Sequence, residues 1–513
     1  MEKIIFIQKP HIIVLVSLNM RQHLTLLILV FCSTLSWAQE RDTRDIPAIS
    51  SIDKAFSVLE SDPDLKNASI SFYVYDAKNK VEVSSHHAEQ SLVTASTMKV
   101  ITTATALDML GSWHKFKTKL GYDGYIDSNC TLHGNLYVIG GGDPTLGSKY
   151  FDDENFMLQW VDEIAKLGIH HIDGKIVGDA TYFSDEYVPS TWGWGDMGNY
   201  YGSGVSGLSV YDNTVTFTFD AGSNNNDSTH VVCFEPYSPD LRIDNRVKAG
   251  DTEKDEAYIY GGPYDPYRVI KGRIPKGSKD FDVRGAMHDP AYVAAFELET
   301  YLFRYGITTS SSATTVRRDR LDGILDTTQR TIFFTHESPS VSQIVYWTNL
   351  ISNNLFAEHL LKHIGVSRYH DGSVYSSTLA VSNYWSDKGV DMTGFSMNDG
   401  SGLSRANAVS AKHLVDILTK MKSSKYFDSF YSSLPNCGKT GTLKSYGKGT
   451  KIYGNLRAKS GTMTRVKSYA GYVKSANGKD LVFAIIVNNH NCSTYDIGKK
   501  LEKLMISLGD YNQ

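Results

Sequence analysis

A serine and a lysine in Ser96-Thr-Met-Lys99 have the residue types and the spacing of a nucleophile and its base. Residues three apart on a helix lie on one face, so this hydroxyl and amine could reach each other. A serine hydroxyl is a weak nucleophile until a base takes its proton, and a lysine can be that base when burial and another cation lower its pKa. Alone, such a serine is more often a helix cap. The same spacing recurs at Ser51–Lys54, Ser112–Lys115 and Ser445–Lys448, which are better explained as caps or loops.

A second candidate element is Ser352-Asn-Asn354, which lies between two amphipathic helical stretches. Ser352 could relay a proton to a leaving amine, and the Asn354 amide could orient Lys99 or hold a substrate carbonyl. On its own, this pattern would indicate a cap between two helices. The position of this pattern, after S-x-x-K and before a K-T-G-like triplet, favours a catalytic role, because the three elements together form one catalytic set.

The third element has two candidates, Lys439-Thr-Gly441 and Lys459-Ser-Gly461. It has to lie on a strand beside the nucleophile, because an extended substrate backbone pairs with that strand and the lysine fixes an anionic or carbonyl end. The second triplet leads into two apolar strand patterns, whereas a polar, glycine-rich stretch typical of an exposed loop follows the first. We therefore predict Lys459 as the functional lysine. Ser460 keeps the hydroxyl of the usual threonine, and Gly461 lets a substrate backbone come close.

These residues need a framework of helices and strands to bring them together. Helical periodicity predicts helices at 49–59, 96–110, 340–365, 410–422 and 497–509, and alternation predicts hairpins at 70–86 and 468–489. Between them, residues 114–330 show short alternating strands and one helix, at 289–306. The expected fold is an α+β domain, formed by residues 39–113 and 331–513 and split by a large β-rich insertion at 114–330.

The composition, with 41% hydrophobic and 21% charged residues in a chain of 513, is typical of a globular protein with several domains. A formal net charge of −4 and the lack of lysine or arginine runs argue against a nucleic-acid partner. Cys130, Cys233, Cys437 and Cys492 are even in number, which permits disulfides without specifying a pairing. Their wide spacing does not indicate zinc, and we expect no metal or other cofactor.

The first 38 residues have the pattern of a cleaved export signal. A short basic segment at 20–23 precedes an apolar core at 24–35 that is too short to span a bilayer, and the sequence S-W-A ending at Ala38 matches a cleavage site. Cleavage there would start the mature chain at Gln39. Translation could begin at Met1 or Met20, and the alternative is that the segment remains as a membrane anchor.

Seven stretches carry a resemblance to a known family: ASTMKVITTATAL, LYVIGGGDPTL, YGSGVSGLSVYDNTV, SNNLFAEHLL, NDGSGLSRANAVSA, LPNCGKTGTLK and RAKSGTMTRVKSYAGYV. Through them, over about residues 45–510, the chain resembles the low-molecular-mass class C penicillin-binding proteins. These are the D-alanyl-D-alanine carboxypeptidase/endopeptidases of the penicillin-binding protein 4 type, peptidase family S13. In that family, the stretch matching CGKTGTLK is a loop upstream of the catalytic strand, which supports the choice of Lys459.

The resemblance implies a penicillin-binding/β-lactamase-like transpeptidase fold with the insertion between S-x-x-K and S-x-N. It also implies the catalytic roles: Ser96 as acylated nucleophile, Lys99 as general base, Ser352 and Asn354 as relay and orienting pair, and Lys459 with Ser460 as electrostatic anchor.

Further roles follow from the resemblance for substrate binding. Backbone N–H groups of Ser96 and Thr462 would form the oxyanion hole. Arg405 and Asp179 match positions that help to bind the peptide side chain with the free amino acid end. The alternatives are a salt bridge that orders the glycine-rich loop for Arg405, and a turn residue for Asp179.

The implied activity is hydrolysis of D-Ala-D-Ala and cross-link bonds in peptidoglycan peptides, in the periplasm, with β-lactams as covalent inhibitors. Two alternatives stay open: a β-lactamase or esterase on the same fold, and a non-catalytic cell-wall-binding protein. The lack of an evident deacylating glutamate motif counts against the first, and the intact motifs count against the second. The sequence does not indicate the oligomeric state or the balance between carboxypeptidase and endopeptidase activity.

Overall fold

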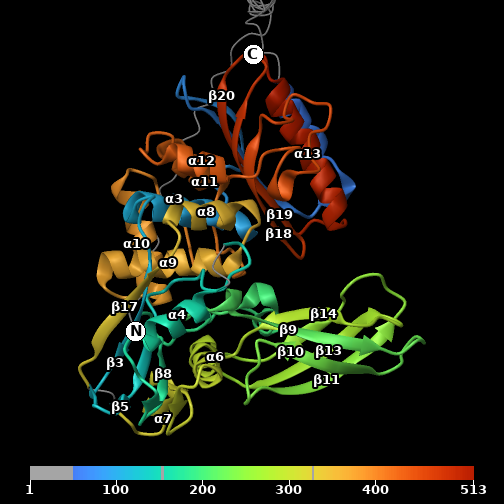
Figure 1. Ribbon diagram of the computed structural model, residues 1–513. Helices are drawn as coiled ribbons and strands as arrows, with labels where there is room; N and C mark the ends of the chain where they lie inside the picture. Colours follow the sequence, from blue (N-terminus) through green and yellow to red (C-terminus); the bar gives the residue numbers. More distant parts are fainter. Residues whose placement is uncertain (1–49, 152–154, 326–327) are drawn as a thin grey trace, which may run out of the picture. The chain divides into compact units, whose positions relative to one another are not determined.

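Figure 1 shows the computed structural model of the protein, which describes residues 50–151, 155–325 and 328–513. The predicted export signal, residues 1–38, lies outside the described residues. Within the described part of the chain, no helix is both long and apolar enough to cross a membrane.

A five-stranded antiparallel sheet, in the order β18-β19-β20-β1-β2, joins the two ends of the described chain (Figure 1). Strand β1 (Ser69–Asp76) pairs with β2 (Val81–His86) in the predicted hairpin, and on its other side with β20 (Asp480–Asn488). Strands β18 (Arg457–Met463), β19 (Val466–Lys474) and β20 form the predicted C-terminal meander. Residues from both ends of the sequence therefore complete one sheet.

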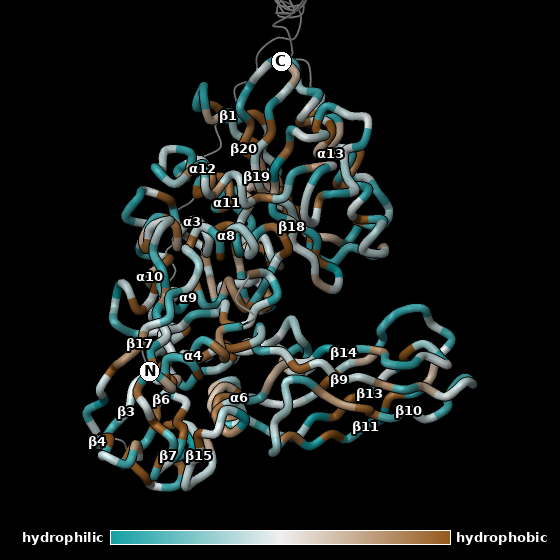
Figure 2. Tube along the Cα trace, in the orientation of Figure 1, coloured by the Kyte–Doolittle hydropathy of each residue, from teal (hydrophilic) through white to brown (hydrophobic). Residues whose placement is uncertain are grey.

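Helices cover both faces of this sheet because its inner strands are apolar on both sides. Along β20, side chains alternate between two cores, with Ala484 in one and Phe483 in the other. Figure 2 shows hydrophobic residues along these inner strands. One face packs against α2 (Ser51–Glu60) and α13 (Thr494–Asp510), and the other packs against α11 (Ala411–Met421).

Beyond α11, a layer of helices forms the rest of this core, and it includes the helices predicted at 96–110 and 340–365. Its members are α3 (Met98–Leu110), α8 (Val341–Leu350), α9 (Asn354–Tyr369), α10 (Val374–Asp387) and α12 (Phe427–Ser433). Sequence patterns did not reveal α10 and α12. In α10, serines and tyrosines interrupt the apolar periodicity of the sequence, although Ala380, Val381 and Trp385 are buried against the core.

Between α3 and α8 the chain forms four further sheets, in the orders β16-β8-β6-β3-β17, β15-β7-β5-β4, β10-β9-β14 and β11-β13-β12. The strand bounds are β3 Lys117–Tyr122, β4 Tyr125–Ile126, β5 Thr131–His133, β6 Leu136–Ile139, β7 His171–Ile172, β8 Ile176–Asp179, β9 Thr214–Ala221, β10 Thr229–Glu235, β11 Arg242–Gly250, β12 Tyr258–Tyr260, β13 Tyr267–Pro275, β14 Phe281–Ala286, β15 Thr308–Thr309, β16 Thr314–Thr315 and β17 Thr331–Glu337. The β-rich character predicted for this region is present.

This region also contains more helix than the sequence indicated. The predicted helix is α6 (Pro290–Arg304), but α4 (Phe156–Ala165), α5 (Trp194–Met197) and α7 (Val316–Leu321) form as well, so the expectation of one helix is wrong. Short helices depend on tertiary packing more than on their own sequence, which hides them from pattern analysis. Because β17 pairs with β3, the sheet that contains these two strands extends past residue 330, the predicted end of the insertion. The division at residues 114 and 330 stays a prediction.

All four cysteines in the described part of the chain are free thiols, so none of the disulfides that the sequence permitted forms among them. Cys437 is buried, and this burial raises the pKa of its thiol to about 12. A thiol of that kind stays protonated and unreactive at neutral pH.

Candidate active site

Ser96 lies in a 3₁₀ turn, Ala95–Thr97, that leads directly into α3. Ala95 has a φ of +46°, a left-handed conformation that is costly for a residue with a Cβ, so packing has to hold the turn in place. Ser468 on β19 does so by donating a 2.5 Å hydrogen bond to the backbone carbonyl that precedes Ala95. The Ser96 hydroxyl caps neither helical segment and instead lies 2.9 Å from Lys99 Nζ.

Lys99 is fully buried, and its Nζ has three close neighbours: Asn354 Oδ1 at 2.6 Å, the Ser401 carbonyl oxygen at 2.6 Å and Ser96 Oγ at 2.9 Å. The first two are carbonyl oxygens, which only accept hydrogen bonds. A neutral amine has two N–H bonds and one lone pair. When both N–H groups point to these carbonyl oxygens, the lone pair is left for the proton of the Ser96 hydroxyl.

Burial lowers the pKa of Lys99 from 10.5 to about 7, while Asp399 and Glu358 oppose this shift. Near neutral pH, a substantial fraction of Lys99 is therefore uncharged and able to act as a base. The sequence led us to expect a second cation to lower this pKa. The repulsion between the two lysines instead acts on Lys459, whose pKa is lowered well below its usual value, first by burial and then by the charge of Lys99.

Ser352 and Asn354 lie at the junction of α8 and α9, where the chain turns sharply. Ser352 has a φ of +63°, a second left-handed residue at the site, and its Oγ accepts a 2.9 Å hydrogen bond from Lys459 Nζ. Asn354 Nδ2 donates to the Tyr201 carbonyl oxygen at 2.7 Å. This bond fixes the amide so that its oxygen faces Lys99.

Lys459 lies on β18, as the strand pattern predicts, and is fully buried. Its Nζ donates to Ser352 Oγ at 2.9 Å and to the Ser460 carbonyl oxygen at 2.8 Å. Lys439 is exposed in the loop ahead of this strand, with its Nζ 4.6 Å from the ring centroid of Tyr453. Of the two candidate lysines, the structure therefore places Lys459 against the S-x-N element and Lys439 in a loop.

Gly461 allows β18 to pass against the turn that carries the candidate nucleophile. A Cβ at this position would lie 2.5 Å from the Thr94 carbonyl oxygen and 3.0 Å from the Ser96 nitrogen, which is closer than real side chains pack. Thr462 follows on the same strand, at the position predicted for the second N–H of an oxyanion hole.

Arg405 is exposed in a loop whose backbone is ordered by a carboxylate. Asp399 accepts hydrogen bonds from the backbone N–H groups of Gly402 and Ser404, at 2.9 and 2.6 Å. Among the described residues, no ion pair of Arg405 is found. The role of Arg405 in substrate binding stays a prediction.

Asp179 ends β8 in the inserted region, and its carboxylate is already engaged there. It forms an ion pair with Arg330 and accepts hydrogen bonds from the backbone N–H and the hydroxyl of Thr181. The structure does not bring it into contact with Ser96 or Lys99. Its predicted role in substrate binding also stays untested.

The sequence analysis did not predict the residues that hold the hydrogen-bond acceptors of Lys99 in place. Glu358 accepts hydrogen bonds from the backbone N–H groups of Gly400 and Ser401, at 2.9 and 2.7 Å, and so holds the Ser401 carbonyl against Lys99. Burial and the nearby Asp399 raise the pKa of Glu358. An acidic residue within the apolar pattern of α9 was the available signal.

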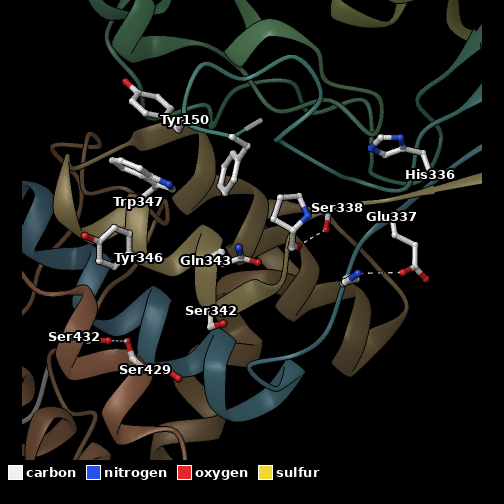
Figure 3. Close-up of a pocket in the computed structure, with 13 residues that line it drawn as sticks. Tyr150, His336, Glu337, Ser338, Ser342, Gln343, Tyr346, Trp347, Ser429 and Ser432 are labelled. Atoms are coloured by element: carbon white, nitrogen blue, oxygen red, sulfur yellow. Dashed lines mark hydrogen bonds and ion pairs between the residues drawn. The ribbon is translucent and has the colours of Figure 1, made fainter. Parts of the chain in front are cut away.

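A cavity of about 800 Å³ lies along α8, away from the candidate nucleophile (Figure 3). The rings of Tyr150, Tyr346 and Trp347 line one end, and the ion pair between Lys115 and Glu337 lies at the other. None of the predicted catalytic residues lines this cavity, so its size is no guide to the chemistry. Across the described part of the chain, no group of three or more His, Cys, Asp or Glu residues could hold a metal ion.

The convergence of α3, the α8–α9 junction and β18 on Ser96 is the arrangement of penicillin-binding serine enzymes, as the order of the three motifs predicts. Residues 52–507 match the D-Ala-D-Ala carboxypeptidase 3 (S13) family, and the chain belongs to this family. It is a serine D-Ala-D-Ala carboxypeptidase, which confirms the activity that the resemblance implied.

Relatives and solved structures agree with this assignment. The chain is 29% identical over 449 residues to a D-alanyl-D-alanine carboxypeptidase from Actinomadura sp. (strain R39), covering 85% of this chain and 80% of that protein. It is 24% identical over 445 residues to the D-alanyl-D-alanine carboxypeptidase DacB of Haemophilus influenzae, covering 85% and 88%. The crystal structure of penicillin binding protein 4 from Haemophilus influenzae matches with a TM-score of 0.75 at 22% identity, covering 90% of this chain and 100% of that chain. This likeness confirms the predicted fold.

Proposed function

We propose that the protein cleaves D-alanyl-D-alanine peptide bonds of peptidoglycan through an acyl-enzyme on Ser96. The observation that carries this proposal is the environment of Lys99. Its amine lies 2.9 Å from Ser96 Oγ with a pKa lowered to about 7, and two carbonyl oxygens occupy its N–H groups. This environment supports Lys99 as the general base.

In the acylation step, neutral Lys99 takes the Ser96 proton while Oγ bonds to the carbonyl carbon between the two D-alanines. The carbonyl electrons move to oxygen, and the N–H groups of Ser96 and Thr462 stabilise the oxyanion. The carbonyl then re-forms, the C–N bond breaks, and the leaving amine receives a proton through Ser352. Because Ser352 Oγ accepts from Lys459, its own proton is free to be donated. Lys99 replaces the proton that Ser352 gives up.

Deacylation repeats this sequence with water in place of the serine. Lys99 takes a proton from water, the resulting hydroxide attacks the ester carbon, and Ser96 leaves with that proton. The speed of this step separates the carboxypeptidase from a β-lactamase on the same fold, because both enzymes pass through an acyl-serine.

The substrate that we propose includes cross-links as well as free stem peptides, because the same bond chemistry applies to both. We also propose that residues 1–38 export the protein to the periplasm, where this substrate lies, and that β-lactams acylate Ser96. The penicillin binding protein 4 of Haemophilus influenzae has been crystallised in complex with a β-lactam, which supports the last point.

Intact-mass analysis after incubation with benzylpenicillin tests the proposal directly. We expect a single adduct, mapped to Ser96, that is released slowly. Digestion of cross-linked muropeptides should yield products that have lost D-alanine or the cross-link. An adduct on Ser51, Ser112 or Ser445 would contradict the assignment, and rapid release without muropeptide cleavage would indicate a β-lactamase.

A further inference from the structure

The cavity along α8 is a candidate binding site that the proposed mechanism does not use (Figure 3). Its volume of about 800 Å³ lies within the usual range of ligand pockets, about 300–1,000 Å³. Gln343, Tyr346 and Trp347 line it from α8, whereas Ile344 and Val345 of the same helix are buried in the core. The fold therefore buries one side of α8 and leaves aromatic and amide groups on the side that borders the cavity.

The rings at one end of the cavity form a continuous aromatic wall. The ring centroids of Tyr346 and Trp347 lie 5.5 Å apart, and those of Trp347 and Tyr150 lie 5.4 Å apart. Tyr346 is 38% exposed, and the other two are partly exposed. Among the residues that the structure describes, neither the two tyrosine hydroxyls nor the Trp347 indole N–H has a hydrogen-bond partner. These side chains therefore offer a ligand both apolar faces and polar edges.

The remainder of the cavity lining is polar. Lys115 and Glu337 form an ion pair of 3.4 Å at the other end, and both side chains are about half exposed. Ser342 on α8 and Ser429 and Ser432 on α12 add hydroxyls. A sugar ring fits this combination, because its faces carry C–H groups that stack on aromatic rings and its rim carries groups that hydrogen-bond. A wholly apolar ligand would instead take the ion pair and the hydroxyls out of water without replacing their hydrogen bonds.

The cavity lies at a distance from the S-x-N element that one stem peptide can span. Helix α8 leads into Ser352, and at about 1.5 Å of rise per residue its cavity-lining stretch lies roughly 8–15 Å along the helix from that serine. The Tyr150 ring also packs against Phe356, on the helix that begins with Asn354. A fully extended peptide of about five residues spans about 17 Å. A sugar in the cavity could therefore carry a stem peptide whose far end reaches the candidate nucleophile.

We propose that this cavity binds the glycan part of peptidoglycan, the N-acetylated aminosugars that carry the stem peptide. A sugar face stacks on the rings of Trp347 and Tyr150, and the Lys115–Glu337 pair hydrogen-bonds to hydroxyl and acetamido groups. This inference rests on the proposed function and adds a second point of attachment for the same substrate. Two linked binding sites act at a high effective concentration, so the sugar strengthens binding of the peptide without any new contact at Ser96.

The first test compares two substrates with the same stem peptide ending in D-Ala-D-Ala, one attached to its disaccharide and one free. The wild-type enzyme should have the higher kcat/KM on the substrate that carries the sugar. Trp347→Ala should lower kcat/KM on that substrate about 5- to 30-fold, as for truncation of an aromatic anchor, and change it less than about twofold on the free peptide. The loss should appear in KM rather than in kcat, because binding alone is weakened.

Two further variants serve as controls for this comparison. Trp347→Phe keeps an aromatic ring and should retain most of the preference for the sugar. Tyr375→Ala should keep the wild-type preference, because Tyr375 is an exposed tyrosine on α10 that does not line the cavity.

A second measurement separates the sugar from the peptide. In isothermal titration calorimetry, the tetramer of N-acetylglucosamine should bind the wild-type enzyme and bind Trp347→Ala much more weakly. It should bind equally well after benzylpenicillin has acylated Ser96, because the cavity lies outside the catalytic site. Loss of binding on acylation would place the sugar in the catalytic site and overturn the proposal.

Equal losses of Trp347→Ala on both substrates would assign this residue to packing, and a wild-type enzyme without preference for the sugar would also overturn the proposal. A preference for a second stem peptide instead of the sugar would mean a peptide occupant, with the same consequence. If Trp347→Ala does not fold by circular dichroism, the variant of the exposed Tyr346, Tyr346→Ala, decides between these outcomes. An enzyme that bound the tetramer but cleaved neither substrate and formed no β-lactam adduct would overturn the proposed function and leave the sugar site standing.

Discussion

Replacing Lys459 by alanine should nearly abolish covalent labelling by penicillin. The Lys459 side chain has no exposure, and its amine supplies hydrogen bonds of 2.9 Å to Ser352 Oγ and 2.8 Å to the Ser460 carbonyl. Its loss leaves the Ser352 hydroxyl, the proposed proton relay, without the donor that orients it. Positioned proton transfer contributes about 10²- to 10⁴-fold to a rate, so acylation should slow by at least about 10²-fold when the relay is lost.

Lys439→Ala is the matched control, because it removes the lysine of the other triplet, whose amine lies in an exposed loop over the ring of Tyr453. It should label at close to the wild-type rate. The rate is measured with a fluorescent penicillin, after circular dichroism has shown that both variants are folded. An inactive Lys439→Ala together with an active Lys459→Ala would refute the argument from strand context.

Three further predictions concern the proposed acylation machinery. Ser96→Ala and Lys99→Ala should each abolish penicillin acylation, by at least several hundred-fold for Lys99, without additive effects; near-wild-type acylation of Lys99→Ala would exclude it as base. Because only neutral Lys99 can take the proton and its pKa is about 7, the acylation rate should rise with pH through about pH 7 and then level off. A rate that falls across this range in stopped-flow measurements would contradict that role. Arg405→Ala should lower kcat/KM on muropeptides more than benzylpenicillin acylation, because a guanidinium can hold a peptide carboxylate, and equal losses would indicate a structural role.

The catalytic motifs could be predicted because each is a local pattern. One helical turn relates Ser96 to Lys99, and the apolar strands that follow Lys459 distinguish it from Lys439. The Ser401 carbonyl that binds Lys99, and Glu358 that positions it, could not be predicted in this way. Ser401 contributes a backbone carbonyl, and every residue has one, so only the tertiary fold shows which carbonyl meets the amine.

The same limit applies to the cavity along α8. Tyr150 and Trp347 are far apart in the sequence, and only the tertiary fold brings their ring centroids within 5.4 Å of each other. For the fold, long apolar periodicities predicted α3, α8, α9 and α11 well. Short helices such as α4 were not predicted, because packing rather than their own sequence stabilises them.

The pairing of β1 with β20 has a consequence for how the enzyme is made. Ser69 pairs with Asn488, so β1 can complete its pairing in the sheet only after β20 has been synthesised. Contacts between such distant residues form late, because a long loop has to close first. In contrast, β9 and β10 are neighbours in the chain and can pair early. Their pairing shortens the flexible segment between β1 and β20 that still has to close. A chain that ended before β18 would carry Ser96 and Lys99 but lack Lys459 and the strand beside them. Penicillin should therefore label only chains that extend through β18 and the strands β19 and β20 of the same sheet.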